Sequence, residues 1–481
     1  MSKRTHPRKT KIVATVGPAS DTLETLRAML QAGMNVARLN LSHGTLEEHK
    51  GRVERIREAA SSLGTQVAIM IDTRGIEVRT GRIPEGSVEL VSGENFSLYT
   101  DARPGGEHGV SVTYQRLALE VNPGDTVLLD DGAMELTVQS VGEREVRCRV
   151  VVGGTLRESK GVNLPDTQLS LSAVDPQNRE DVHRELTFAA ENDVEYIAAS
   201  FMQSADDVNR LREILLANGV NIPIIAKIEN RAGMDNLDAI VAAADGIMVA
   251  RGDLGVELPM ADVPGMQKKM IRTTVSNGKP VITATQMLAS MERNPKPTRA
   301  EASDVANAIL DGSSAIMLSG ETAAGSYPVE SVKTMAELAV RTEASLREYG
   351  YLQRIIPHPS HVVTEAVSHA AARMADQLGA TAIVSLTDTG FTSRLMSKHR
   401  PECPILAVTS FPKVARRLCL NWGVVPTLYR DKQTDDAKIA FAIEKATEQG
   451  FVRPGDTLIV TASHSATAGG TNLIRVLTVG S

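Results

Sequence analysis

The chain has 481 residues, enough for two to four domains that each bury a core of their own. Lys and Arg number 52 against 58 Asp and Glu, and 42% of the residues are hydrophobic, which gives no reason to expect a nucleic-acid or membrane partner. The three cysteines are widely spaced and odd in number, which predicts buried free thiols in a reducing cytoplasm. The basic N-terminal segment leads into a strand without the apolar core of a signal peptide, so we expect a cytoplasmic protein.

Strand patterns alternate with helical patterns in two stretches of the chain. The eight candidate strands are residues 12–16, 35–38, 67–71, 196–201, 223–228, 246–250, 280–285 and 314–318. Asp21 with Glu24, and Thr45 with Glu48, have the spacing of helix capping boxes, and Gly33 is a stop signal. Eight strands with intervening helices predict a (β/α)8 TIM barrel with its functional face at the carboxyl ends of the strands. An open doubly wound sheet remains an alternative to the barrel.

One connection, from about residue 82 to 164, has no helical period. Its alternating segments are separated by turn signals at 123–125, 131–132 and 153–154, which predict hairpins of a small all-β domain. We therefore expect the first part of the barrel at 1–81, the inserted β-rich domain at 82–164, and the second part of the barrel at 165–350. Inserted after the third barrel strand, the small domain could act as a lid.

The last part of the chain forms a separate unit. Residues 352–362 contain two prolines and read as a linker. Beyond them strands and helices alternate again, so we expect a C-terminal α/β domain at 351–481.

Four strands of the predicted barrel end in polar residues. Lys227 and Glu229 are two residues apart and so lie on one face of their strand. The other three strands end in the groups Arg38-Asn40-Ser42, Asp72-Thr73 and Arg251-Gly252-Asp253. Each ending alone could be ordinary turn chemistry, but four of them favour one shared polar pocket.

The residue types in this pocket indicate its chemistry. Three cations, Arg38, Arg79 and Lys227, suit an anionic substrate, whereas carboxylates suit Mg²⁺. The carboxylates are Asp72, Glu229 and Asp253, and the neutral oxygens are those of Asn40, Ser42, Thr73 and Thr285. Phosphoryl transfer needs this combination, because its catalysis consists mainly of positioning and charge stabilisation. The sequence has no G-x-x-x-x-G-K-[ST] loop, so a nucleotide would be held in another way.

The same segments closely resemble pyruvate kinase of the bacterial type. The matches include TKIVATVGPAS at 10–20, NVARLNLSHGT at 35–45, IAKIEN at 225–230, VARGDLGVE at 249–257 and MLSGETAAGSYP at 317–328. The resemblance implies a TIM barrel with an inserted small all-β barrel domain, a C-terminal effector-binding domain and a homotetramer. The implied reaction is phosphoryl transfer from phosphoenolpyruvate to ADP, which gives pyruvate and ATP in the final step of glycolysis.

The resemblance also implies roles for individual residues. Lys227 would stabilise charge, Arg38 would hold the substrate phosphate, and Thr285 and Gly252 would lie beside the substrate. Glu229 and Asp253 would bind Mg²⁺ or Mn²⁺, with Asp253 also at the substrate. The candidate nucleotide contacts are Asn40, Ser42, His43, Arg79 and Lys160, and the candidate potassium ligands are Asn40, Ser42, Asp72 and Thr73. Glu77, beside that site, indicates dependence on K⁺.

A phosphorylated allosteric effector is expected in the C-terminal domain. The expected contacts are Thr387, Thr389, Gly390 and Thr392, where a strand ends and a helix begins, with a second loop at 463–471 closing over them. Asp388 would repel a second phosphate group, so we expect a monophosphate to activate in preference to fructose 1,6-bisphosphate.

Two other functions remain open at this point. One is a metal-dependent lyase or aldolase, in which Lys227 stabilises charge or forms a Schiff base. The other is a catalytically inactive metabolite sensor that works through residues 351–481.

Overall fold

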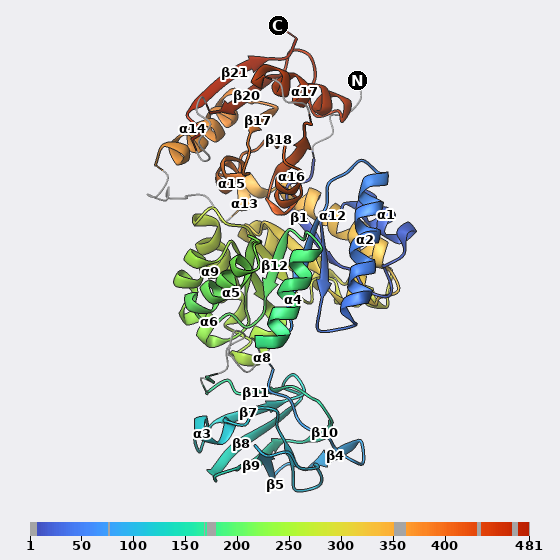
Figure 1. Cartoon of the computed structure of the whole chain (residues 1–481), viewed down its shortest axis with the longest axis vertical. Helices are drawn as coiled ribbons and strands as arrows, with labels where there is room; N and C mark the ends of the chain where they lie inside the picture. The colour runs from blue at the N-terminus through green and yellow to red at the C-terminus, as the bar shows by residue number, and fades with distance from the viewer. Residues whose placement is uncertain are drawn as a thin grey trace.

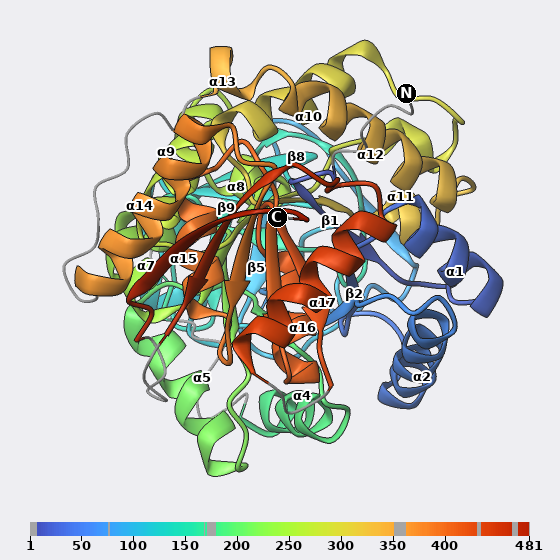
Figure 2. The same cartoon turned by 90° about the horizontal axis from the view of Figure 1, so that it is seen from above.

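The computed structural model describes residues 7–75, 77–167, 169–170, 179–350, 362–430, 434–463 and 470–480. A barrel lies in the middle of the elongated molecule, with an all-β domain at one end and an α/β domain at the other (Figure 1). Seen from above, the α/β domain lies over the barrel, and the barrel helices are visible around the edge of the molecule (Figure 2). The predicted linker falls almost entirely outside the described residues, and the domain boundaries stay predictions.

Eight parallel strands close the barrel in the order β1-β16-β15-β14-β13-β12-β3-β2. They are β1 (Lys11–Thr15), β2 (Val36–Asn40), β3 (Ala68–Asp72), β12 (Tyr196–Ala199), β13 (Ile224–Ile228), β14 (Gly246–Ala250), β15 (Val281–Ala284) and β16 (Ala315–Leu318). The closed sheet confirms the predicted (β/α)8 barrel and excludes the open doubly wound sheet. Two predicted strands end early, because Phe201 and Thr285 have φ angles of 53° and 68°, which no strand accommodates.

The barrel helices cover the outside of the strands. They are α1 (Leu23–Ala32), α2 (Leu46–Ser62), α4 (Arg179–Glu191), α5 (Ala205–Ala217), α6 (Arg231–Asp235), α7 (Leu237–Ala243), α8 (Arg251–Glu257), α9 (Val263–Ser276), α10 (Arg299–Asp311), α11 (Gly320–Ala323), α12 (Pro328–Glu343) and α13 (Leu346–Tyr349). The capping box of Thr45 and Glu48 is confirmed at α2. The box predicted for Asp21 is wrong, because Thr22 caps α1 and the Asp21 carboxylate pairs with Arg52 at 3.3 Å.

The chain leaves the barrel after β3 and forms the predicted all-β domain before it returns. Its elements are β4 (Ser87–Leu90), β5 (Asn95–Tyr99), β6 (Gly109–Ser111), α3 (Leu117–Glu120), β7 (Thr126–Leu129), β8 (Met134–Val141), β9 (Glu145–Val152), β10 (Gly154–Arg157) and β11 (Val162–Asn163). They form a six-stranded sheet and a two-stranded sheet. The predicted hairpin at 131–132 joins β7 to β8, where Asp131 and Gly132 both have positive φ.

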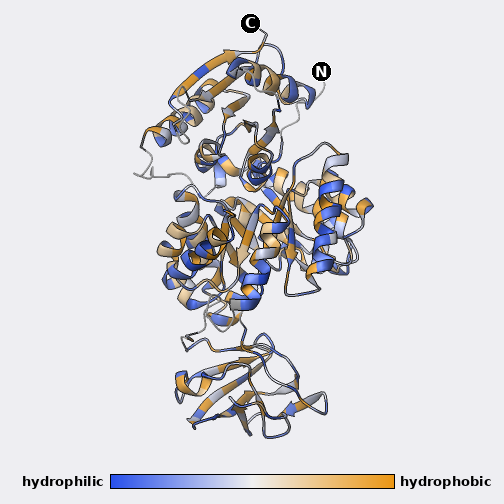
Figure 3. Cartoon of the chain, in the orientation of Figure 1, coloured by the Kyte–Doolittle hydropathy of each residue, from blue (hydrophilic) through white to orange (hydrophobic). Residues whose placement is uncertain are grey.

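The C-terminal domain has a five-stranded sheet in the order β19-β18-β17-β20-β21, of which β21 alone is antiparallel. Its elements are α14 (Val362–Leu378), β17 (Ala382–Leu386), α15 (Phe391–Lys398), β18 (Ile405–Thr409), α16 (Pro412–Arg417), β19 (Val424–Leu428), α17 (Asp435–Glu448), β20 (Thr457–Ala462) and β21 (Leu473–Thr478). Hydrophobic residues concentrate in the barrel strands, whereas a surface helix such as α2 is mostly hydrophilic (Figure 3). Among the described residues, none of the helices combines the length and the apolar character that crossing a membrane requires.

Candidate active site

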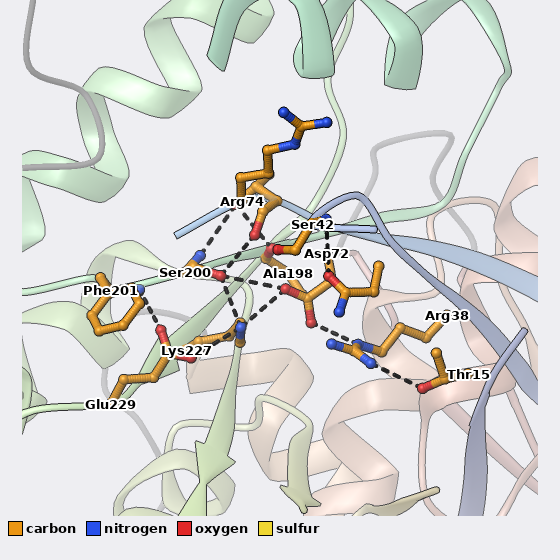
Figure 4. A network of polar contacts seen from close by, with 12 residues as sticks. Thr15, Arg38, Ser42, Asp72, Arg74, Ala198, Ser200, Phe201, Lys227 and Glu229 are labelled. Carbon is orange, nitrogen blue, oxygen red and sulfur yellow. Dashed lines mark hydrogen bonds and ion pairs between the residues drawn. The ribbon is translucent and has the colours of Figure 1, made fainter. Parts of the chain in front are cut away.

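Lys227 lies near the carboxyl end of β13, with its side chain inside the barrel mouth. Its ammonium nitrogen Nζ lies 3.0 Å from Asp72 Oδ1, 2.9 Å from Glu229 Oε1 and 2.8 Å from Ser200 Oγ (Figure 4). Lys227 and Glu229 therefore share a face, as their spacing predicts, and β3 brings Asp72 to the same point. Three oxygen acceptors match the three protons of an ammonium group.

Arg38, on β2, binds the carboxylate of Asp72 as well. Its Nε donates to Asp72 Oδ2 at 2.6 Å, and its Nη1 donates to Thr15 Oγ1 at 2.9 Å (Figure 4). Asp72 is thus bound by two cations, each on its own oxygen. The guanidinium and the ammonium lie on either side of one buried carboxylate, which fixes both positive charges at the barrel mouth.

Burial and the charges of neighbouring groups together shift the pKa values of Asp72 and Lys227. Burial would raise the pKa of Asp72, but the charges of Arg38 and Lys227 outweigh burial and lower it. Burial would lower the pKa of Lys227, but the carboxylates of Asp72 and Glu229 outweigh it and raise that pKa above its ordinary value. Lys227 is therefore protonated at neutral pH. This disfavours the Schiff-base alternative, because a nucleophilic lysine must be neutral.

Glu229 and Asp253 form the candidate divalent-cation site. Burial is the largest cause that raises the pKa of Glu229 to about 7, and the charge of Asp253 adds to the rise while Lys227 opposes it. Burial also raises the pKa of Asp253. Two adjacent carboxylates with this unfavourable charge are what a hard divalent cation stabilises. Among the described residues, no group of three or more His, Cys, Asp or Glu side chains could hold a metal ion.

The end of β15 brings Thr285 to the neighbouring strand. Its Oγ1 accepts a hydrogen bond of 2.8 Å from the backbone N–H of Gly252, at the start of α8. Thr285 has a φ of 68°, a conformation that a β-branched residue rarely adopts. The Arg251 guanidinium donates to the Thr285 carbonyl at 2.7 Å and stabilises this turn. A strained residue held by its surroundings is typical of functional sites.

The candidate potassium ligands lie at the ends of β2 and β3. Asn40 Oδ1 accepts a hydrogen bond of 3.2 Å from the Ser42 N–H, which folds the loop after β2 over the barrel mouth. Thr73 is buried next to Asp72, whereas Ser42 and the adjacent His43 are exposed. The set offers oxygen atoms only, which suits a hard monovalent cation.

The inserted domain brings Arg79 and Lys160 close together. An isolated antiparallel bridge pairs the backbone of Arg79 with that of Gly161, and the Thr80 N–H donates to the Lys160 carbonyl at 2.8 Å. The Arg79 guanidinium forms an ion pair with Glu77, and Lys160 Nζ lies 2.8 Å from Asp130. A cavity of about 600 Å³ between this domain and the barrel is lined by Arg79, Glu77 and Asp253 among others. The cavity therefore connects Arg79 with Asp253 at the barrel mouth, whereas Lys160 is not part of its lining.

The four predicted effector residues also come together, at the start of α15. The Gly390 N–H donates to Thr387 Oγ1 at 2.9 Å, and the Phe391 N–H lies 3.4 Å from Thr389 Oγ1. Thr392 Oγ1 lies 2.5 Å from Thr471 Oγ1, so the second predicted loop does contact the first. Residues 464–469 of that loop lie outside the described residues.

Two residues of the network escaped the sequence analysis. Ser200 follows β12 and touches Lys227, Asp72 and Thr73. Thr15 ends β1 and holds Arg38. Both are polar residues directly at the end of an apolar strand, which is the signal that identified the other four strands.

Together, the closed barrel and its mouth define a class of protein: a TIM-barrel protein whose strand ends hold two fixed cations beside paired carboxylates. Family models place the chain more narrowly: residues 7–332 match "Pyruvate kinase, barrel domain", and residues 365–477 match "Pyruvate kinase, alpha/beta domain". The pyruvate kinase of Bacillus licheniformis is 47% identical over 98% of this chain and 81% of its own length. The pyruvate kinase of Geobacillus stearothermophilus is 46% identical over 98% of this chain and 80% of its own length. The chain belongs to the pyruvate kinase family.

Proposed function

We propose that this protein is a pyruvate kinase that transfers the phosphoryl group of phosphoenolpyruvate to ADP and so produces pyruvate and ATP in glycolysis. The observation that carries the proposal is the Lys227 ammonium, fixed between Asp72 and Glu229 at the barrel mouth. A permanently protonated lysine is suited to stabilise the charge of a transferring phosphoryl group and of an enolate. Family membership supports the same activity.

The other residues of the mouth would bind and orient the substrate. Arg38 suits the phosphate, because its guanidinium offers several donors in a rigid plane. The Gly252 N–H and the Thr285 hydroxyl suit the carboxylate, and the hydrogen bond between them would open when the substrate arrives. The nucleotide would occupy the cavity under the inserted domain, with Arg79 and Lys160 as its cationic contacts and Asn40, Ser42 and His43 at its edge. Movement of the inserted domain would exclude water.

Two cations complete the proposed site. Glu229 and Asp253 would hold Mg²⁺ or Mn²⁺, which when bound neutralises charge on the transferring phosphoryl group. Asn40, Ser42, Asp72 and Thr73 would hold K⁺. Glu77 adds negative charge at the barrel mouth, where its charge adds to burial in raising the pKa of Asp253.

The proposal extends to regulation, assembly and location. A phosphorylated effector would bind the loop from Thr387 to Thr392, and the family resemblance indicates a homotetramer. The three cysteines are free and buried, which fits a reducing cytoplasm.

The test is pyruvate formation from phosphoenolpyruvate, measured with and without ADP, Mg²⁺ and K⁺. We expect activity only when all three are present. A lyase or aldolase would consume its substrate without ADP, and a sensor would consume none.

The potassium site has its own test. Glu77→Lys puts a cation near the proposed K⁺ position, so this variant should be active without K⁺ whereas the wild type should not. Glu94→Lys, at an exposed position in the inserted domain, is the matched control and should keep the K⁺ requirement. Full activity of the wild type in potassium-free and sodium-free buffer would refute the K⁺ site.

A further inference from the structure

Ser200 lies at the centre of the polar network in Figure 4, although no role has been assigned to it so far. The residue follows β12 directly and is 2% exposed. Its Oγ lies 2.8 Å from Lys227 Nζ, 2.8 Å from the main-chain oxygen of Thr73 and 3.3 Å from Asp72 Oδ1. Its backbone N–H donates to Thr73 Oγ1 at 3.2 Å. Ser200 therefore contacts Lys227 with its hydroxyl and Thr73 with both its hydroxyl and its backbone.

The direction of these hydrogen bonds follows from the chemistry of the groups. An ammonium group only donates, so Ser200 Oγ accepts a proton from Lys227. A hydroxyl has a single proton to give, and the shorter of its two remaining contacts is the one to the Thr73 oxygen. The hydroxyl thus forms a chain from Lys227 through Ser200 to Thr73.

Ser200 differs from the two other acceptors of Lys227 in its charge. Asp72 and Glu229 are carboxylates, and the proposed function assigns them to K⁺ and to the divalent cation. A carboxylate that coordinates a cation has less negative charge left to attract an ammonium group. Ser200 is neutral and is not a proposed ligand, so neither cation draws charge away from the oxygen that accepts the hydrogen bond of Lys227.

We propose that Ser200 is a positioning residue that orients the Lys227 ammonium and links it to the potassium site through Thr73. This inference rests on the proposed function and extends it. Ser200 keeps Nζ in place when the cations occupy the carboxylates, and it fixes both oxygens of Thr73 that face the site. K⁺ binding and the position of Lys227 are then coupled through Ser200 in addition to the direct contact of Lys227 with Asp72.

The test compares Ser200→Ala with Ser313→Ala. Ser313 is also fully buried, and its hydroxyl lies 2.7 Å from Thr283 Oγ1, but it lies at the opposite end of the barrel from the site. Both substitutions remove one buried serine hydroxyl, so they match in their general effect on packing. Only Ser200→Ala should lower kcat, by roughly 10-fold to 100-fold, the range found for residues that orient catalytic groups. The KM for ADP should stay near that of the wild type.

A second measurement does not depend on catalysis. K⁺ that binds the folded protein raises its midpoint of thermal unfolding, compared with a buffer that contains a large organic cation in its place. Ser200→Ala should need a several-fold higher K⁺ concentration for half of this rise, and Ser313→Ala should need the wild-type concentration. Ser200→Cys, which keeps a weak acceptor, should be intermediate and replaces the alanine variant if that variant does not fold.

The outcomes distinguish a failure of the role of Ser200 from a failure of the proposed function. Equal kcat values in Ser200→Ala and Ser313→Ala, or an unchanged K⁺ midpoint in Ser200→Ala, would overturn the role of Ser200. An inactive wild type would refute the proposed function instead, and the K⁺ midpoints would still decide whether Ser200 acts on the potassium site.

Discussion

Glu185 of α4 is buried beneath the loop that follows β3. Its side chain is 6% exposed, and its Oε2 accepts a hydrogen bond of 3.2 Å from the Arg74 backbone N–H. Burial raises the pKa of Glu185 to about 7, although Arg74 opposes the rise. The carboxyl group is therefore partly protonated at neutral pH, and its ionisation in the folded protein costs free energy.

Glu185→Gln should change how stability depends on pH. The unfolded chain ionises Glu185 above a pH of about 4.5, whereas the folded protein does so only near 7, so this residue removes stability as the pH rises between the two values. The variant lacks this loss. Its free energy of unfolding relative to the wild type should rise by on the order of 2 kcal/mol between pH 5 and pH 8. Urea unfolding at the two pH values measures the difference, and a constant difference would show that Glu185 ionises normally.

At the scale of elements, the loop before α15 is where we expect an anion to bind in the C-terminal domain. Gly390 has a φ of 78°, and Thr387 Oγ1 accepts the hydrogen bond from its N–H. The hydroxyl of Thr392 already forms a hydrogen bond with the hydroxyl of Thr471 in the neighbouring loop. A bound phosphate would therefore draw on the hydroxyl of Thr389 and on the N–H groups of the first turn of the helix.

A sugar monophosphate or AMP should activate the enzyme at subsaturating phosphoenolpyruvate, and Thr389→Ala should raise the concentration needed for half activation. Asp388 disfavours a second phosphate group, so fructose 1,6-bisphosphate should be the weaker activator. Thr447→Ala is the control, because Thr447 lies on α17 and only bonds within its own helix. Strong activation by the bisphosphate alone would contradict the charge argument, and no response to any phosphate would make the loop purely structural.

The elements that sequence reasoning predicted best are those with a strong hydrophobic pattern. The eight barrel strands are four or five residues long, mostly apolar and mostly buried, and helical patterns follow most of them. Strands β19 and β21 were not predicted, because β19 contains Pro426 and is half-buried, and β21 is an exposed edge strand. The cap of α1 was assigned to Asp21 because the sequence cannot tell which of two neighbouring side chains turns toward the helix.

The charged residues that contact Lys227 were all predicted, whereas two neutral residues of the network, Ser200 and Thr15, were missed. Lys227, Glu229 and Asp72 stand out because charge at the end of a buried strand is rare. Ser200 does not stand out, since a serine after a strand usually serves a turn. Its position at the end of an apolar strand was a weak signal, and its distances to Lys227 and Thr73 identify it.

At the scale of the whole molecule, a buried ion cluster joins the barrel to the C-terminal domain. Glu195 lies just before β12 and is fully buried, and its carboxylate binds Arg57 at 2.8 Å and Arg416 of α16 at 2.5 Å. The same carboxylate accepts the Ile69 N–H of β3 at 2.7 Å. Strands β3 and β12 carry Asp72 and Ser200 at their other ends. This contact is thus a direct physical link between the C-terminal domain and the strands of the site.

Arg416→Met should destabilise the protein, because it leaves Glu195 buried with one cation in place of two. We expect a loss of about 2 kcal/mol, which corresponds to roughly 2 °C to 5 °C in the midpoint of thermal unfolding, depending on how much of the chain unfolds together. Arg475→Met is the matched control: Arg475 pairs with Asp436 on the surface of the same domain, where an ion pair contributes little. Equal midpoints for the two variants would show that the buried cluster does not hold the domains together.

The most direct test of the proposed function uses ³¹P NMR to follow the phosphate signals of phosphoenolpyruvate and of ATP. Both are recorded in one mixture of enzyme, phosphoenolpyruvate, ADP, Mg²⁺ and K⁺. For the wild type we expect the phosphoenolpyruvate signal to fall as the γ-phosphate signal of ATP rises in equal amount. Lys227→Met should slow this transfer by about 100-fold or more, because it removes the charge aimed at the transition state. Release of inorganic phosphate in place of ATP, or transfer by Lys227→Met at the wild-type rate, would contradict the account.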